Sequence, residues 1–377
     1  MNLRQLPRDL HPIAWWIWAI GLAAAASMTT NPLLLLLLIG VAAVVVAARR
    51  SDHPWARSFR LYLLMGAAIV VIRVLFRILL GGGEGTTVWL DLPEIPLPDW
   101  VLGIQLLGPV TRESVLAGLY DGLRLAAIVI CVGAANSLAN PKRLLKSVPP
   151  ALYEIGTALV VAVSVLPQLA DSLRRVRAAQ ELRGGPTGRI WRLRRLLIPV
   201  LEDALDRSLK LAAGMDTRGY GRAGGLTRGE RRRTGALMLV GLSGVCVGVY
   251  AVLDKQAPRV LAVPMLVLGC LAALIGIVSA GQRVQRTRYR PDRWRAAEVV
   301  VAVCGLAVAA GLWKVTSTDL LIAYPDLTTA PQVTLTALLA VLVGLIPAVA
   351  APQPVTSRVP HSLAPVKGDR DREPVAA

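Results

Sequence analysis

The chain has 377 residues, of which 54% are apolar, and its formal net charge is +18. Its mean hydropathy is +0.55. Several near-uncharged runs of about 17 to 24 residues match the length that an α-helix needs to cross a hydrocarbon core. This composition excludes an ordinary soluble globular domain and predicts an all-α, polytopic helical membrane protein.

We expect about eight transmembrane helices, each formed by one apolar run. Tryptophans stand near several of the predicted ends, where the amphipathic indole suits the headgroup region. The four cysteines all fall within these runs, and the three histidines are isolated, so no metal site is predicted. The predicted spans are residues 13–28, 32–48, 61–80, 115–138, 235–253, 260–280, 296–312 and 333–350.

Charge orients these predicted helices. The connections between the second and third spans and between the sixth and seventh are rich in Arg, whereas the connection 81–112 has four acidic residues and one basic residue. The positive-inside rule therefore places the first two connections in the cytoplasm and the third outside. Both chain ends are expected on the cytoplasmic side of the plasma membrane, and the tail 351–377 has the composition of a disordered segment.

Residues 139–234 form a large insert between the N-terminal helices (1–138) and the C-terminal helices (235–350). The stretch 155–169 is apolar enough to cross the membrane, but the block 171–233 that follows holds sixteen Lys or Arg against seven Asp or Glu. A crossing would place this basic block outside, against the positive-inside rule. We therefore expect the stretch to lie at the inner interface or to be covered by protein.

Two amphipathic helices are predicted in the insert, separated by the glycine-rich break 184–188. Their apolar positions recur at the spacing of a helix face, and charged residues occupy other positions. In the first helix this face is formed by Leu166, Leu169, Leu173, Val176 and the polar Gln180, and in the second by Leu201, Leu205, Leu209, Ala212 and Met215.

A short motif closes each of these helices. The segment Ala179-Gln180-Glu181-Leu182-Arg183-Gly184 is answered by Ala213-Gly214-Met215-Asp216-Thr217-Arg218-Gly219. A glycine after a helix and a basic residue in its last turn are ordinary helix-ending chemistry. Because the pattern occurs twice in one insert, we expect the guanidinium groups of Arg183 and Arg218 also to pair with carboxylates of a partner.

On these residues the chain resembles the transmembrane T component of energy-coupling-factor transporters, the EcfT/CbiQ family, in which two Ala-Arg-Gly signatures end two cytoplasmic coupling helices. The resemblance extends over the opening spans, the acidic external connection, the stretch from Asp121 into Asn140-Pro141 and the region through Arg222, whereas the last two or three spans carry little family signal. It implies a non-enzymatic subunit that joins two ABC-type ATPases to a substrate-binding S component, for uptake of vitamins or of transition-metal ions such as cobalt or nickel.

The resemblance also assigns residues. The ATPase-coupling positions would be Ala179, Arg183, Gly184, Ala213, Arg218 and Gly219. The second motif departs from the family pattern at Gly214 and at Asp216-Thr217. The chain contains no G-x-x-x-x-G-K-[ST] loop, so we expect no cofactor in this chain and ATP bound by the partner subunits.

A cluster of four charged residues falls inside the third and fourth predicted spans. Arg73 and Arg77 are one turn apart in the third span, and Asp121 and Arg124 lie near the start of the fourth. A rise of about 1.5 Å per residue puts Arg73 and Asp121 at similar depth. Because charges in lipid are costly, we expect a structural ion pair of Asp121 with Arg73 or Arg77, and a role along a substrate path stays open.

Two other functions stay open from the sequence. One is a stand-alone permease with a path lined by Arg73, Asp121 and Arg124, and the other is a membrane anchor for an unrelated cytoplasmic complex. Nucleic-acid binding is not predicted, because orientation, membrane lipid and an acidic partner explain the basic block of an amphipathic, membrane-adjacent insert. In the family that the chain resembles, the choice of substrate would rest with the S component.

Overall fold

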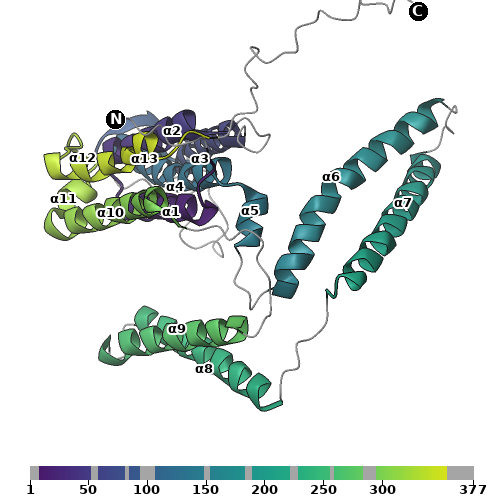
Figure 1. Cartoon of the computed structure of the whole chain (residues 1–377). Helices are drawn as coiled ribbons and strands as arrows, with labels where there is room; N and C mark the ends of the chain where they lie inside the picture. The colour runs from purple at the N-terminus through teal and green to yellow at the C-terminus, as the bar shows by residue number, and fades with distance from the viewer. Residues whose placement is uncertain are drawn as a thin grey trace, which may run out of the picture. The chain divides into compact units, whose positions relative to one another are not determined.

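The computed structural model describes residues 8–51, 58–80, 85–93, 107–147, 153–182, 189–220, 228–254, 259–282 and 294–354. Figure 1 shows the elements of the whole chain, and contacts within the chain divide it into two compact units. The first is formed by Met1–Leu144 together with Asp292–Ala377, and the second by Leu145–Pro291. The C-terminal spans, which the sequence analysis treated as one part, are thus divided between the two units.

The described residues are mostly helical, which confirms the predicted fold class. The first unit contains α1 (Pro12–Ser27), α2 (Pro32–Arg49), α3 (Phe59–Leu79), β1 (Val88–Asp91), β2 (Pro109–Thr111), α4 (Arg112–Leu138), α5 (Pro141–Lys146), α10 (Ala296–Thr318), α11 (Leu320–Ala323), α12 (Leu335–Leu342), the 3₁₀ turn η3 (Val343–Leu345) and α13 (Ile346–Ala350). The second contains α6 (Tyr153–Leu182), α7 (Arg189–Thr217), α8 (Arg228–Leu253) and α9 (Arg259–Gln282).

Among the described residues, seven helices are long and apolar enough to cross a membrane: α2, α3, α4, α6, α8, α9 and α10. The 16-residue α1 and the segment Leu335–Ala350 are shorter apolar helices. All eight predicted spans therefore coincide with helical segments. Length and composition alone also admit α6, which the charge argument keeps out of the membrane, and that assignment stays a prediction.

Several helices of the first unit begin at side chains that cap free backbone donors. Asn31 accepts a hydrogen bond from the amide of Leu33, and Pro32 occupies the first turn, where no donor is needed. Thr111 accepts from the amide of Ser114 at the start of α4. These local signals explain why α2 and α4 begin where they do.

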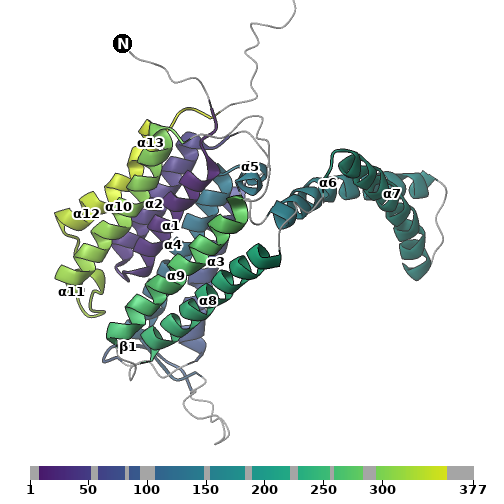
Figure 2. The same cartoon turned by 60° about the horizontal axis from the view of Figure 1, so that its bottom comes forward.

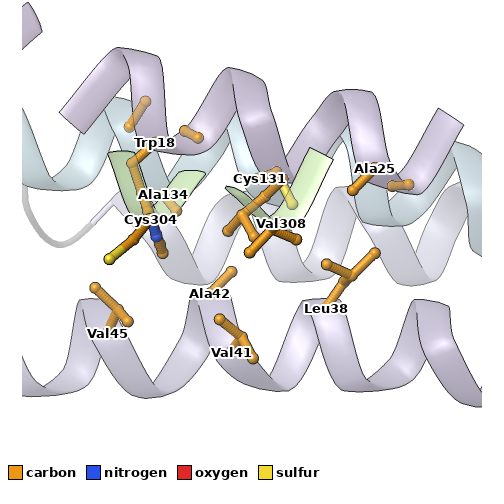
Figure 3. Packing of buried hydrophobic residues seen from close by; sticks show 14 of the residues in the cluster. Trp18, Ala25, Leu38, Val41, Ala42, Val45, Cys131, Ala134, Cys304 and Val308 are labelled. Atoms are coloured by element: carbon orange, nitrogen blue, oxygen red, sulfur yellow. The ribbon is translucent and has the colours of Figure 1, made fainter. Parts of the chain in front are cut away.

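The core of the first unit lies where α1, α2, α4 and α10 meet (Figure 3). Trp18, Cys131 and Val308 are among its fully buried side chains, and each comes from a different helix. The indole of Trp18 donates a 3.2 Å hydrogen bond to the carbonyl oxygen of Gly344. This bond satisfies the polar edge of the ring inside an apolar core.

Two glycines allow α1 and α10 to cross at close range. A Cβ atom added at Gly21 would lie 2.2 Å from the carbonyl oxygen of Gly305, and one added at Gly305 would lie 2.3 Å from the Cα atom of Trp18. Small residues at a crossing are typical of membrane helices, because they let the backbones approach. The crossing attaches α10 firmly to the N-terminal helices.

The last predicted span, 333–350, is not one regular helix. It is broken into α12, η3 and α13. Pro347 has no amide hydrogen to donate to the carbonyl of Val343, one turn earlier, and Gly344 lies in the 3₁₀ turn between the two helices. The carbonyl of Gly344 in this turn accepts the hydrogen bond from the indole of Trp18 in the core.

The acidic connection 81–112 contains a short antiparallel pair of strands, β1 and β2. The side chain of Glu113, at the start of α4, accepts hydrogen bonds from the hydroxyl group of Thr87 at 3.1 Å and from its amide at 3.4 Å. These bonds tie the β1 end of the hairpin to α4.

In the second unit, α8 and α9 pack along most of their lengths, and Figure 2 shows them side by side. Gly241, Gly244 and Gly248 face the backbone of α9 so closely that an added Cβ atom would lie 2.5–2.9 Å from its atoms. Their outer faces are rich in exposed Leu and Val. This hairpin has the composition and the packing of a pair of membrane helices.

Candidate functional site

The two amphipathic helices predicted in the insert are present as α6 and α7. They lie alongside each other and contact along part of their length (Figure 1). Their closest polar contact is a 2.6 Å hydrogen bond from the hydroxyl group of Ser172, which is buried, to the carboxylate of Asp203. The insert is therefore a helical hairpin whose two arms are joined by a specific polar contact.

Asp203 is the centre of this contact. Its other carboxylate oxygen accepts a 3.0 Å hydrogen bond from Arg207, one turn later on α7, and Arg175 of α6 lies 3.5 Å away. The hydrogen bond from Ser172 and then the one from Arg207 lower the pKa of the Asp203 carboxyl below its ordinary value. Asp203 is therefore ionised at neutral pH, and its carboxylate links α7, on which it lies, to Ser172 of α6.

A hollow of about 360 Å³ lies between α6 and α7 around this contact. Apolar side chains such as Val165, Leu169, Leu211 and Met215 line most of it. The two helices thus meet loosely, because apolar side chains surround one polar connection without filling the space between the arms.

The five apolar residues predicted to share one face of α7 divide into two groups in the structure. Ala212 and Met215 face α6 across the hollow. Leu201, Leu205 and Leu209 are each 62% exposed and point away from the described neighbours. Together with exposed Leu193 and Leu197, they form a row at four-residue intervals, which we call the leucine stripe.

The end of α7 has the predicted helix-ending chemistry. Gly219 has a positive φ of 76°, the amide of Tyr220 donates to the carbonyl of Met215 at 3.1 Å, and the amide of Gly219 donates to that of Asp216 at 2.9 Å. These two bonds and the left-handed residue are the Schellman ending of a helix. They fix the backbone on both sides of Arg218.

The side chain of Arg218 is exposed at this fixed turn. Within the described part of the chain, it has no ion-pair partner. Ala213 and Gly214, one turn earlier, are exposed as well, and a Cβ atom added at Gly214 would meet nothing within 4 Å. The guanidinium group is therefore held on an open surface where a carboxylate of another protein can approach.

The first motif is only partly described. Ala179 is exposed near the end of α6, which ends at Leu182, so Arg183 follows the helix directly, as Arg218 follows α7. Arg183 and Gly184 themselves lie outside the described residues. So do residues 185–188 of the predicted break and residues 355–377 of the tail.

The charged residues of α3 and α4 are only partly brought together. Arg77 and Asp121 lie 3.8 Å apart, and both side chains are partly exposed. Arg77 is one of the two partners that the sequence predicts for this carboxylate. Arg124 donates a hydrogen bond to the carbonyl oxygen of Ser27, at the end of α1.

Sequence reasoning missed the buried charge of Glu298. Glu298 is 1% exposed, lies 3.0 Å from Arg8 and accepts a hydrogen bond from the amide of Arg295. It stands three residues after Arg295, the N-cap residue of α10, which is the spacing of a capping box, and this spacing could have revealed it. Glu298 holds the beginning of the chain against α10 and lies apart from the insert. Among the described residues, no group of His, Cys, Asp and Glu has the arrangement of a metal site.

Comparison with known proteins decides the family. The family described as cobalt transport protein, CbiQ, matches residues 4–227, more than half of the chain. The chain belongs to the CbiQ family. The match covers α1 to α7, including the motif at Arg218, and it ends before α8.

Two curated relatives of this CbiQ-family chain are energy-coupling factor transporter transmembrane proteins, EcfT. The protein from Leuconostoc gelidum is 30% identical over 132 residues, which cover 30% of this chain and 49% of the relative. The protein from Staphylococcus aureus is 28% identical over 127 residues, which cover 29% of this chain and 47% of the relative. The chain thus spans about half the length of the curated relatives that it matches. CbiQ membership and the apolar helices together make the chain a multi-pass component of membrane transport.

Proposed function

We propose that this chain is the transmembrane coupling component of an energy-coupling-factor transporter. The observation that carries the proposal is the hairpin α6–α7 within the family match, whose second helix presents an exposed arginine on a fixed Schellman turn. The chain itself is a scaffold without catalytic residues, and ATP is bound by partner subunits.

Two ABC-type ATPase subunits are the proposed partners of the Arg-Gly motifs. The bidentate fork of an arginine fits a carboxylate, and Arg218 is exposed at the end of a helix where no described carboxylate is in reach. Arg183 takes the same place after α6 by sequence. One arginine docks on each ATPase. The small residues Ala179, Gly184, Ala213 and Gly219 lie around the two arginines at the helix ends.

The leucine stripe is the proposed contact for a membrane-embedded S component. A row of exposed leucines on a helix that also carries many charges is typical of an apolar face that is covered in the assembly or lies at the membrane interface. When ATP closes the two ATPases, the docked ends of α6 and α7 move with them. The loosely joined hairpin then transmits this movement to the S component and reorients it.

The proposed localisation is the plasma membrane, with both chain ends, α6 and α7 on the cytoplasmic side. The basic block 171–233 supports this orientation through the positive-inside rule. The family description, cobalt transport protein, supports cobalt as the proposed cargo. A chemically similar transition-metal ion or a vitamin is the alternative that the resemblance implies, and the S component is proposed to select the cargo.

The direct test is co-purification of the tagged chain from native membranes. We expect two copies of ATPase, identical or different, and one small membrane protein to be recovered with it. Recovery of the chain with a cytoplasmic complex that has no ATPase would favour a membrane anchor, and transport by the purified chain alone would favour a permease.

A further inference from the structure

The outer face of α3 carries two arginines that the proposed function does not use. α3 packs against α4 along one face, and most of its remaining side chains are exposed. A Cβ atom added at Gly122 would lie 3.1 Å from the Cβ atom of Arg73, and one added at Gly118 would lie 2.9 Å from the Cγ atom of Arg77. The stems of both arginines therefore rest on α4, whereas both residues remain exposed.

These arginines border a hollow of about 570 Å³ on the surface of α3. Its lining residues are Ile69, Ile72, Arg73, Phe76, Arg77 and Leu80. Arg73 and Arg77 are near the Leu79 end of the helix, and Ile72 and Ile69 follow toward its middle. The part of the hollow near the membrane surface therefore combines the two arginines with Phe76 and Leu80, and the deeper part, at Ile72 and Ile69, is apolar only.

The described residues neutralise the cationic end only in part. Asp121 forms an ion pair with Arg77 at 3.8 Å, beyond hydrogen-bond distance, and Arg73 has no described ion-pair partner. A guanidinium group that faces lipid is unfavourable unless an anion or water accompanies it. Arg77 is two residues from the end of α3 and Arg73 is about 9 Å below that end, so both can reach toward the headgroups.

We propose that Arg73 and Arg77 bind the phosphate of an anionic phospholipid and that one acyl chain of this lipid occupies the hollow over Ile72 and Ile69. Two guanidinium forks one turn apart provide paired donors for phosphate oxygens. The order of charge and apolar surface along α3 matches the order in a lipid molecule. In the predicted orientation the lipid belongs to the outer leaflet.

Native mass spectrometry of the purified full chain, titrated with phosphatidylglycerol or with phosphatidylcholine of the same acyl chains, tests this site. The wild-type chain should prefer phosphatidylglycerol by about tenfold. Arg73→Gln, which keeps Arg77 beside Asp121, should lower the affinity for phosphatidylglycerol by about tenfold, because one charge-assisted pair is lost. Ile72→Trp should weaken binding of this lipid without any change of charge, because the indole fills the hollow.

Arg60→Gln is the matched control, since Arg60 is an exposed arginine at the opposite end of the same helix. It should leave the preference unchanged. Inorganic phosphate at equal concentration should not displace the lipid, because it cannot use the hollow. Equal binding of both lipids by the wild type, or unchanged affinity in Arg73→Gln, would overturn the proposal. Recovery of an acidic membrane protein bound at Arg73, with no lipid bound there, would also overturn the proposal.

Discussion

At the scale of single residues, Asp203 is the side chain on which the α6–α7 pairing depends most. It accepts from Ser172 on one helix and from Arg207 on its own helix. Its lowered pKa means that this stabilising contribution is complete above the pKa of an unfolded aspartate, about 3.9, and is lost as the pH falls through the lower folded value.

We therefore expect pairing of α6 with α7 to be insensitive to pH between about 5 and 8 and to weaken in acid below about pH 4. Asp203→Asn should weaken the pairing at the pH values where Asp203 is ionised and remove the part of the acid dependence that belongs to Asp203. Amide hydrogen exchange of α6 and α7, followed against pH, measures this. Glu202→Gln is the control, because Glu202 is exposed beside Asp203 on α7. Equal exchange in Asp203→Asn and Glu202→Gln would contradict the account.

Asp121 gives a second prediction at this scale. In detergent without anionic lipid, Asp121→Ala leaves Arg77 without its nearest carboxylate. We expect a loss of about 1–3 kcal/mol in the free energy of unfolding, and partial recovery in the double variant with Arg77→Gln. Thermal unfolding of the three variants measures the coupling. Additive effects of the two substitutions would show that the pair does not contribute to stability.

Single residues were predictable where the chemistry is local. The Arg-Gly pattern predicts a helix end with a left-handed glycine, and Gly219 has that conformation. The partner of Arg124 was not predictable, because Ser27 offers a backbone carbonyl, and carbonyls carry no signature in the sequence. The role of Asp203 was equally hidden, since Ser172 belongs to another helix and only the packing brings the two together.

At the scale of helices, the position of α6 is the main open prediction. α6 is long and apolar enough to cross a membrane, yet the basic block after it favours an interfacial position. Cysteines at Lys146 and at Asp216, which are exposed before α6 and near the end of α7, should both resist an impermeant thiol reagent in intact cells.

A cysteine at exposed Thr86, beside β1, is the control and should react from outside. The background must lack the native cysteines, of which Cys246 and Cys270 are exposed in the structure. Labelling of the cysteine at Asp216 in intact cells, with none at Lys146, would show that α6 crosses the membrane.

The crossing of α1 and α10 makes a prediction about packing. Gly305→Ala places a methyl group 2.3 Å from the Cα atom of Trp18, so the helices must separate. We expect a loss of about 1–3 kcal/mol in stability, as is usual for an overpacked site. Gly40→Ala is the matched control, because nothing lies within 4 Å of an added Cβ atom there. Thermal unfolding that ranks the two variants equally would argue against this crossing.

Hydrophobicity predicted where the helices lie, but it did not predict where a helix is broken. Each predicted span coincides with a helical segment, but hydrophobicity predicts the segment with Gly344 and Pro347 as one regular helix. The hydrogen bond from Trp18 to Gly344 at this break joins residues more than three hundred positions apart, so the sequence pattern did not reveal it. Along α7, leucines four residues apart drift around the helix, because four residues turn it by more than a full circle. This drift does not separate the stripe from Ala212, because seven residues bring Ala212 to within about 20° of Leu205 around the helix. Leu201, Leu205 and Leu209 are exposed while Ala212 and Met215 line the hollow toward α6, because α6 and α7 contact along only part of their length.

At the scale of the whole chain, the family match and the two units have different boundaries. The match ends at residue 227, whereas α10 to α13, far beyond it, pack into the core of α1, α2 and α4. The N-terminal helices were recognisable from family motifs. The packing of α10 against these helices could not be recognised from a motif, because it depends on complementary shape at residues such as Gly21 and Gly305.

The central claim is that the Arg-Gly ends of α6 and α7 hold two ATPases. The alternative explanation is that these arginines only end their helices. It predicts that Lys serves nearly as well as Arg and that charge reversal costs at most about 1 kcal/mol of helix stability. Docking predicts that Arg218→Glu makes the assembly sensitive to salt and that Arg218→Lys is intermediate, because the bidentate fork is lost.

Pull-down of ATPase subunits by the double variant Arg183→Glu/Arg218→Glu tests this claim most directly. Membrane insertion of the variant, measured in the same preparation, is the control. We expect normal insertion with loss of both ATPases, because two linked contacts reinforce each other and fail together. Recovery of both ATPases at the wild-type level, with uptake intact, would contradict the account and leave Arg183 and Arg218 as helix-ending residues only.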